Sequence, residues 1–254
     1  MKSDKATLIK QGIILFLLGF AGVLSTLPLI PQLLTLQPEQ PPIPMFLIQL
    51  LSLMQTSALL AGMVLLGSFF SHRVNLRPPI IQSICRSEYA LVKFRGIILP
   101  AILGGVIGGV CILACSSVYS SYLPSDFLES QKVFSPPWYT RILYGGITEE
   151  ILVRWGLMSF LVWCCFRVTQ RAGSSIRPYN YWIAIVLSAL IFGAGHLPVA
   201  FILSSVVTVP LVVYLIVGNA IFGVIAGYLY WRHGLESAIV AHMIAHVTLI
   251  ATEA

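Results

Sequence analysis

Long apolar runs separated by short polar turns make up most of this sequence. A membrane-spanning α-helix needs about 20 predominantly apolar residues. Seven runs are close to this length or exceed it: residues 9–34, 43–70, 96–122, 138–166, 179–196, 211–231 and 235–250. A further apolar stretch, 199–209, is too short to cross alone and is followed by Pro210, so we expect it to be re-entrant or interfacial. The pattern predicts an all-α, polytopic membrane helical bundle with seven crossings, or eight helices if the short stretch is counted.

The composition agrees with this pattern. Hydrophobic residues form 57% of the chain, charged residues form 9%, and the mean hydropathy is +0.90, which excludes a soluble globular protein. No stretch resembles a separate soluble domain, so we expect residues 1–254 to form a single integral membrane domain. The net charge of +6 comes from basic residues in short loops beside apolar runs, where they orient spans. We therefore expect no nucleic-acid partner.

The distribution of lysine and arginine predicts the orientation of the spans. The N-terminus, the segment 73–95, the loop 167–177 and Arg232 all fall on one side of the predicted topology. Because basic loops are retained in the cytoplasm, we expect a cytoplasmic N-terminus and a C-terminus on the outer side. The segment 73–95 has apolar residues at mixed spacing, so we interpret it as a loop with a helix lying on the membrane surface.

Small residues in two spans predict close helix packing. The third span contains Gly104, Gly105, Gly108 and Gly109, and the sixth contains Gly223 and Gly227 in a GxxxG pattern. Glycine lets two helix backbones approach each other in a membrane.

The stretch GGITEEILVRWG places three charged residues inside the fourth span. A charge at the centre of a membrane helix costs roughly 2.5–3.5 kcal/mol on insertion scales, so these residues need partners. Glu150 and Arg154 are four apart and can pair on one helix face. Glu149 points about 140° away from Arg154 on an α-helical wheel. It is left as an unpaired carboxylate, which favours base chemistry, although a purely structural ion cluster is the alternative.

Three histidines join this polar set. His196 ends the fifth span in FGAGHLP, and His242 and His246 are four apart, on one face of the last span. Taken alone, a histidine in a membrane span usually bonds to a backbone carbonyl, and the HxxxH spacing also suits zinc. Together with the two glutamates, however, these histidines form a buried polar group whose members need each other.

The order of these motifs resembles a known family. EEILVR with GG shortly before it, then FGAGH, then AHMIAH after a GxxxG-bearing span and a WRHGL turn, is similar to the CPBP family. This family, also called the Abi family, contains the CAAX prenyl endopeptidases and their bacterial relatives involved in bacteriocin immunity or peptide processing. The resemblance covers about residues 138–254, which we take as the catalytic-motif region.

The resemblance implies the CAAX prenyl endopeptidase-like fold and intramembrane proteolysis by a glutamic endopeptidase. By position, Glu149 corresponds to the general base that activates water, with His196 beside it, and His242 and His246 correspond to the groups that stabilise the oxyanion. Supporting positions are Glu150 and Arg154 in the first motif and Phe192 in the second.

The last position departs from the family pattern, because proteolytic relatives usually have asparagine where this chain has His246. A neutral histidine can still donate one hydrogen bond to an oxyanion. The substitution also leaves open a zinc-dependent version of the protease, in which His196, His242 and His246 with Glu149 would be the metal ligands. We favour a hydrolase without metal or other cofactor.

Two other function classes remain as alternatives. A non-catalytic membrane scaffold, or an immunity or regulatory protein on the same fold, would keep the polar cluster for stability. A proton-coupled transporter would also contain intramembrane glutamate and histidine. For the protease we expect the lipid bilayer and a peptide or membrane-protein substrate as partners, prenylated or not, and a location in a bacterial inner membrane.

Overall fold

The computed structural model describes residues 5–36, 41–171 and 173–253, and this part of the chain is helical with no strand. Seven helical segments are long and apolar enough to cross a membrane, which confirms the predicted class and number of crossings. They are Lys5–Thr35, Met45–Val74, Phe94–Tyr122, Trp138–Thr169, Pro178–Leu203, Val209–His233 and Leu235–Thr252.

Several of these segments consist of more than one helix. The elements in chain order are α1 (Lys5–Ser25), α2 (Leu29–Thr35), α3 (Met45–Phe70), η1 (Ser71–Val74), α4 (Pro79–Cys85), α5 (Ala90–Tyr119), η2 (Ser120–Tyr122), α6 (Ser125–Val133), α7 (Trp138–Thr140), η3 (Arg141–Glu149), η4 (Ile151–Met158), α8 (Ser159–Thr169), α9 (Pro178–Ala194), α10 (Leu197–Leu203), α11 (Val209–His233) and α12 (Leu235–Glu253). The short elements fall at the ends of the bundle, except η3 and η4, which lie within the fourth span.

Two stretches differ in detail from the prediction. The stretch 199–209 is only partly helical: the short helix α10 follows α9 after a turn at residues 195–196, within the same candidate span, and a non-helical segment leads from it to α11. The basic segment 73–95 contains the short helix α4, but its last part already belongs to α5. Helix α5 also continues through Pro100, so apolar packing in a span overrides the local preference for a break.

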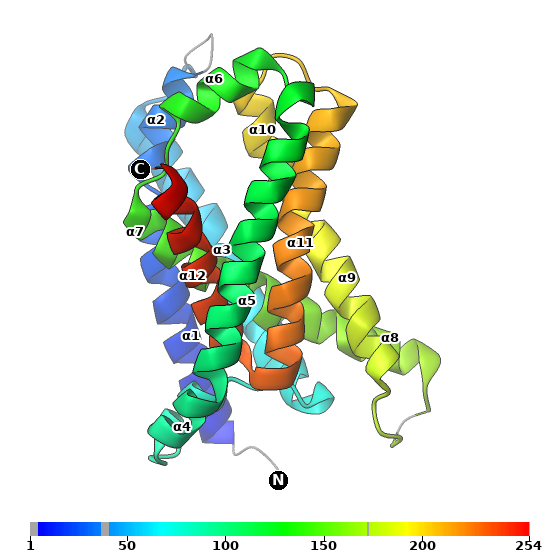
Figure 1. Cartoon of the computed structure of the whole chain (residues 1–254). Helices are drawn as coiled ribbons and strands as arrows, with labels where there is room; N and C mark the ends of the chain where they lie inside the picture. Colours follow the sequence, from blue (N-terminus) through cyan, green and yellow to red (C-terminus); the bar gives the residue numbers. More distant parts are fainter. Residues whose placement is uncertain (1–4, 37–40, 172, 254) are drawn as a thin grey trace.

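The basic segments gather at one end of the bundle. The N-terminus, α4, the chain that follows α8 and the turn between α11 and α12 lie at the lower end in Figure 1, whereas α2, α6 and α10 lie at the opposite end. This grouping agrees with the sequence prediction that these basic segments share one side.

Glycines bring α5, α11, α9 and α12 into direct backbone contact. A Cβ atom added at Gly105 would overlap the Ala241 carbonyl of α12, and one added at Gly223 would overlap Ala189 of α9. Both glycine-rich spans therefore pack as the sequence predicts. By contrast, Gly62 on α3 is exposed, with open space around it.

At the end opposite the N-terminus, α6 is joined to the segment after α10 by Asp126. Its carboxylate accepts hydrogen bonds from the Ser205 hydroxyl and amide, both at 2.7 Å, and from the Ser204 hydroxyl at 3.0 Å. These hydrogen bonds lower the pKa of Asp126 to about 2, and the bond from the Ser205 hydroxyl has the largest effect. Beneath them, Phe127 packs against a small apolar cluster that includes Leu203.

The Gly105 contact predicts a stability difference between two glycine-to-alanine substitutions. Gly105→Ala must separate α5 from α12, and overpacking of this kind typically costs about 1–3 kcal/mol. Gly62→Ala should be neutral or slightly stabilising, because alanine has the higher helix propensity and the position is open. Thermal unfolding of both variants in detergent measures this, and equal midpoints would contradict the close packing.

The Asp126 contacts predict an acid-sensitive link. Because the folded-state pKa lies below the ordinary value of 3.8, ionised Asp126 stabilises the fold above about pH 4, and this contribution is lost as the pH falls through about 2. We expect the unfolding midpoint of Asp126→Asn to fall below that of the wild type at neutral pH and to approach it near pH 2. Thermal unfolding between pH 2 and 7 tests this; a difference independent of pH would refute it.

Candidate active site

The fourth span is π-helical where it carries the charged motif, over η3 and η4. In a π-helix the hydrogen bonds run between residues five apart, so each turn is wider than the 3.6 residues of an α-helix. Side-chain hydroxyls follow the same spacing: Thr148 bonds to the Leu143 carbonyl, and Ser159 to that of Arg154. Such segments are rare and frequently occur at functional sites.

The wider turn changes where Glu149 points. The α-helical wheel places it about 140° from Arg154. In the wider turn, residues five apart come closer to one face, and Glu149 and Glu150 both contact the same imidazole, that of His242. Glu149 therefore lies near the ring that also binds Glu150, on the side of the other ring nitrogen.

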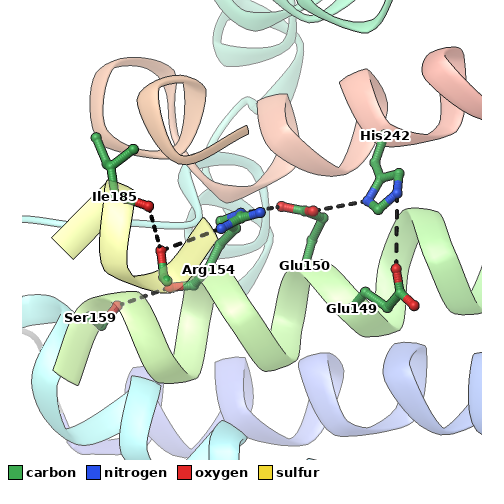
Figure 2. A network of polar contacts seen from close by, with 7 residues as sticks. Glu149, Glu150, Arg154, Ser159, Ile185 and His242 are labelled. Carbon is green, nitrogen blue, oxygen red and sulfur yellow. Dashed lines mark hydrogen bonds and ion pairs between the residues drawn. The ribbon is translucent and has the colours of Figure 1, made fainter. Parts of the chain in front are cut away.

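A chain of charged and polar contacts runs through the buried centre (Figure 2). The Arg154 Nε donates to Glu150 Oε2 at 3.1 Å, and His242 Nδ1 lies 2.9 Å from the other carboxylate oxygen, Oε1. On the far side of the ring, His242 Nε2 lies 4.0 Å from Glu149 Oε2. Glu150 and Arg154 are fully buried, while the Glu149 side chain is 19% exposed. Glu149 is therefore the more exposed of the two carboxylates.

The contact with Glu150 defines the tautomer of His242. A carboxylate paired with arginine only accepts hydrogen bonds, so Nδ1 of His242 is the donor. In the neutral ring, Nε2 then carries no proton and presents a lone pair toward Glu149. Glu150 thus contacts the Arg154 guanidinium with one carboxylate oxygen and orients the His242 ring with the other.

Arg154 is also held from α9. Its Nη1 is 3.5 Å from the Ser188 hydroxyl, and its guanidinium carbon lies 5.6 Å from the centre of the Phe192 ring. Ser188 in turn donates to the Ile185 carbonyl at 3.1 Å. The Arg154 and Glu150 pair therefore ties together the fourth span, α9 and α12.

The other two predicted histidines, His196 and His246, lie near His242. His196 Nδ1 donates to the Phe192 carbonyl at 2.9 Å, and the Phe192 ring contacts both His196 and His242 edge-on. In the described part of the chain no hydrogen bond or ion pair joins His196 to Glu149, so the structure does not bring these two residues into the expected contact. Phe192 lies between His196 and the charged chain.

His246 stacks on His242, with ring centres 4.9 Å apart and planes 11° from parallel. Both of its ring nitrogens are buried without a hydrogen-bond partner. Its Nε2 lies against Gly145, where a Cβ atom would overlap it. His246 is thus a buried polar group, stacked on the ring that both glutamates contact, with unused hydrogen-bonding capacity.

Comparison with known families gives one match, and it covers this site. Residues 132–248 match the family model described as type II CAAX prenyl endopeptidase Rce1-like. The matched region contains the glutamate motif and all three of these histidines. Over this region the chain resembles the CPBP family of CAAX proteases. No curated protein and no solved structure gave a significant match.

The zinc-dependent alternative needs several ligand side chains close together. Among the described residues, no group of three or more histidine, cysteine, aspartate or glutamate side chains is arranged to hold a metal ion. The four side chains of the zinc alternative therefore do not converge in this arrangement.

The site also contains residues that the sequence analysis did not single out. Ser188 supports Arg154, and Phe222 lies 4.4 Å, ring centre to ring centre, from His242. Ser159 and Tyr230 share a buried hydrogen bond at 2.9 Å. A polar residue inside an apolar run was the available signal for the two serines, but nothing in the sequence identifies their partners.

The buried pair predicts a thermodynamic cycle. Glu150→Gln leaves Arg154 buried without its counter-charge, which typically costs about 3–5 kcal/mol of unfolding free energy. Replacing both residues by methionine should cost less than the single change, because no unpaired charge remains. Chemical unfolding in detergent measures the cycle, with the partly exposed Glu149→Gln as the control. Additive losses would show that the two charges do not depend on each other.

Proposed function

We propose that this protein is an intramembrane endopeptidase of the CAAX prenyl protease type, in which Glu149 activates water to hydrolyse a peptide bond. The observation that carries the proposal is the pair of adjacent glutamates on either side of one imidazole. Glu150 is neutralised by Arg154, whereas Glu149 has no cation of its own apart from the ring and is partly exposed. The match to a family of membrane endopeptidases supports the same reaction.

In the proposed first step, Glu149 takes a proton from a water molecule. Its Oε2 and His242 Nε2 are 4.0 Å apart, too far for a hydrogen bond and close enough for one water molecule to contact both. Because Nε2 of the neutral ring is an acceptor, His242 can help to orient this water and share the proton with Glu149. The hydroxide then attacks the carbonyl carbon. When the tetrahedral intermediate collapses, the C–N bond breaks and Glu149 returns its proton to the leaving nitrogen. His196, beside Phe192, is the group we expect to contact the water from the α9 side.

In the second step, charge develops on the carbonyl oxygen. His246 is the best placed donor, because its ring nitrogens are buried and unpartnered while it stacks on His242. One such donor is typically worth about 3–4 kcal/mol of transition-state stabilisation. His242 donates from Nε2 only when its ring is doubly protonated, since Glu150 holds its other nitrogen. We therefore assign the oxyanion first to His246 and second to the imidazolium form of His242.

The glycines around the site do not all line a substrate groove. The space beside three of them is already occupied: His246 lies against Gly145, Met243 against Gly146, and the Ile216 backbone against Gly193. Gly195 is exposed. We propose that substrate backbone approaches near Gly195 and His196, at the end of α9.

The substrate is a peptide or a membrane protein, because the family consists of membrane-embedded proteases. The mechanism needs no cofactor. We further propose a bacterial inner membrane with the basic end of the bundle in the cytoplasm. In this orientation, the lower end of Figure 1 faces the cytoplasm.

Replacing the base tests the proposal. Glu149→Gln should lower cleavage of a membrane-embedded reporter peptide library by at least about 10²-fold, because a positioned base contributes about 10²–10⁴-fold. The matched control is Glu129→Gln, which changes an exposed glutamate on α6. Both purified proteins are assayed with and without chelator.

The arms separate the alternatives. Chelator-resistant cleavage that only Glu149→Gln abolishes supports the glutamate mechanism. Loss with chelator and recovery with zinc would replace that mechanism by the metal-dependent one. Cleavage that is equal in wild type and Glu149→Gln would remove Glu149 from the reaction and favour a structural role for the cluster.

A further inference from the structure

A cavity lies at the basic end of the bundle, away from the chain of charged residues around Glu150. It has a volume of about 280 Å³, close to the roughly 300 Å³ at which small-ligand sites begin. Its walls come from α1, η1, α4, the segment before α4, and one residue of η4. The lining residues are Leu8, Gln11, Ser71, His72, Leu76, Arg77, Pro78, Gln82, Arg86 and Trp155.

The charge of this cavity is positive. Arg77 and Arg86 approach it from the segment before α4 and from the end of that helix. No acidic side chain lines it among the residues that the structure describes. Lys10 is also near: burial raises the pKa of the Cys85 thiol on α4, and the Lys10 charge opposes that shift. Glu236 accepts a hydrogen bond from the Ile81 amide of α4 at 2.8 Å, but it is not part of the lining.

A buried polar group inside the cavity has no protein partner. Gln11 is only 2% exposed, and its Nε2 makes no hydrogen bond. A buried amide donor left unpaired costs about 1–3 kcal/mol, so this position is explained by an acceptor that the protein itself does not supply. Both arginines and the amide are donors. A negatively charged acceptor would complement all three groups.

We propose that this cavity binds a phosphate group, and that the phosphate is the headgroup of an anionic phospholipid. Guanidinium groups match phosphate oxygens in a two-pronged geometry, and basic pockets between membrane helices bind anionic headgroups. Leu8 and Leu76 provide apolar wall beside the charged residues, as the junction between headgroup and acyl chain requires. The proposal is independent of the protease mechanism, because none of the lining residues belongs to the proposed catalytic group.

The test is lipid binding to the purified full chain in detergent, read by native mass spectrometry. The probes are dioctanoyl phosphatidylglycerol and, as the zwitterionic comparison, dioctanoyl phosphatidylcholine. The variants are R77Q/R86Q, Q11L and R77K/R86K. The matched control is R171Q/R177Q, which removes the same charge from exposed positions in another loop at the same end.

We expect the wild type to bind phosphatidylglycerol at least about tenfold more tightly than phosphatidylcholine. R77Q/R86Q should lose that preference, since each basic residue near an anionic headgroup contributes roughly fivefold. R77K/R86K should keep part of it, Q11L should weaken it, and R171Q/R177Q should leave it within about twofold of the wild type. Unfolding midpoints measured in parallel identify any variant that fails to fold.

Two results would overturn the proposal: equal affinity of the wild type for both lipids, or equal losses in R77Q/R86Q and R171Q/R177Q. Inorganic phosphate is added as a competitor in a further arm. Competition at concentrations similar to those of the lipid would retain phosphate binding but replace the headgroup by a free anion as the source. Absence of such competition supports the headgroup.

Discussion

The contact between Glu150 and Arg154 determines how the centre of this bundle is built. Two charges within an apolar span need each other and further polar partners. Arg154 contacts the Ser188 hydroxyl and the Phe192 face on α9, while its Nη2 is buried without a hydrogen bond, and Glu150 bonds to His242 on α12. The pair therefore acts between three spans. A shift of either neighbouring helix would leave a charged or polar atom without a partner.

The second constraint is close packing around the fourth span. Glycines on the neighbouring helices permit it, in addition to the glycines of the span itself. A Cβ atom at Gly22 of α1 would overlap Thr148, and one at Gly67 of α3 would overlap the Trp155 ring. Thr148 also donates to the Gly19 carbonyl of α1 at 2.8 Å. The side of the fourth span that faces α1 and α3 is thus held by backbone proximity, while the other side carries the charged chain.

The spans could be predicted from the sequence because a bilayer requires long apolar runs, and the Glu150 pair could be predicted because it is local in sequence. Three features could not. The sequence of η3 and η4 does not indicate a π-helix, so the approach of Glu149 to the His242 ring could not be predicted. The bond between Glu150 and His242 joins residues 92 apart, and only the packing of α12 creates it. The cavity around Gln11 likewise forms only when α1, α4 and η4 come together.

Two side chains, Glu149 and His246, are not needed for the stability of the fold. Their presence favours an active site over a scaffold. The Arg154 and Glu150 pair would be complete without Glu149, whose carboxylate makes no hydrogen bond with any described residue and meets only the His242 ring at 4.0 Å. His246 buries two polar nitrogens with no partner, at a position where an apolar side chain would remove that cost. Natural proteins violate such rules mainly where function requires it. Glu149 and His246 are both in contact with His242, so the two unfavourable features meet at one point. A hydrolytic site needs a free base and a free donor at such a point, whereas a structural ion cluster needs neither.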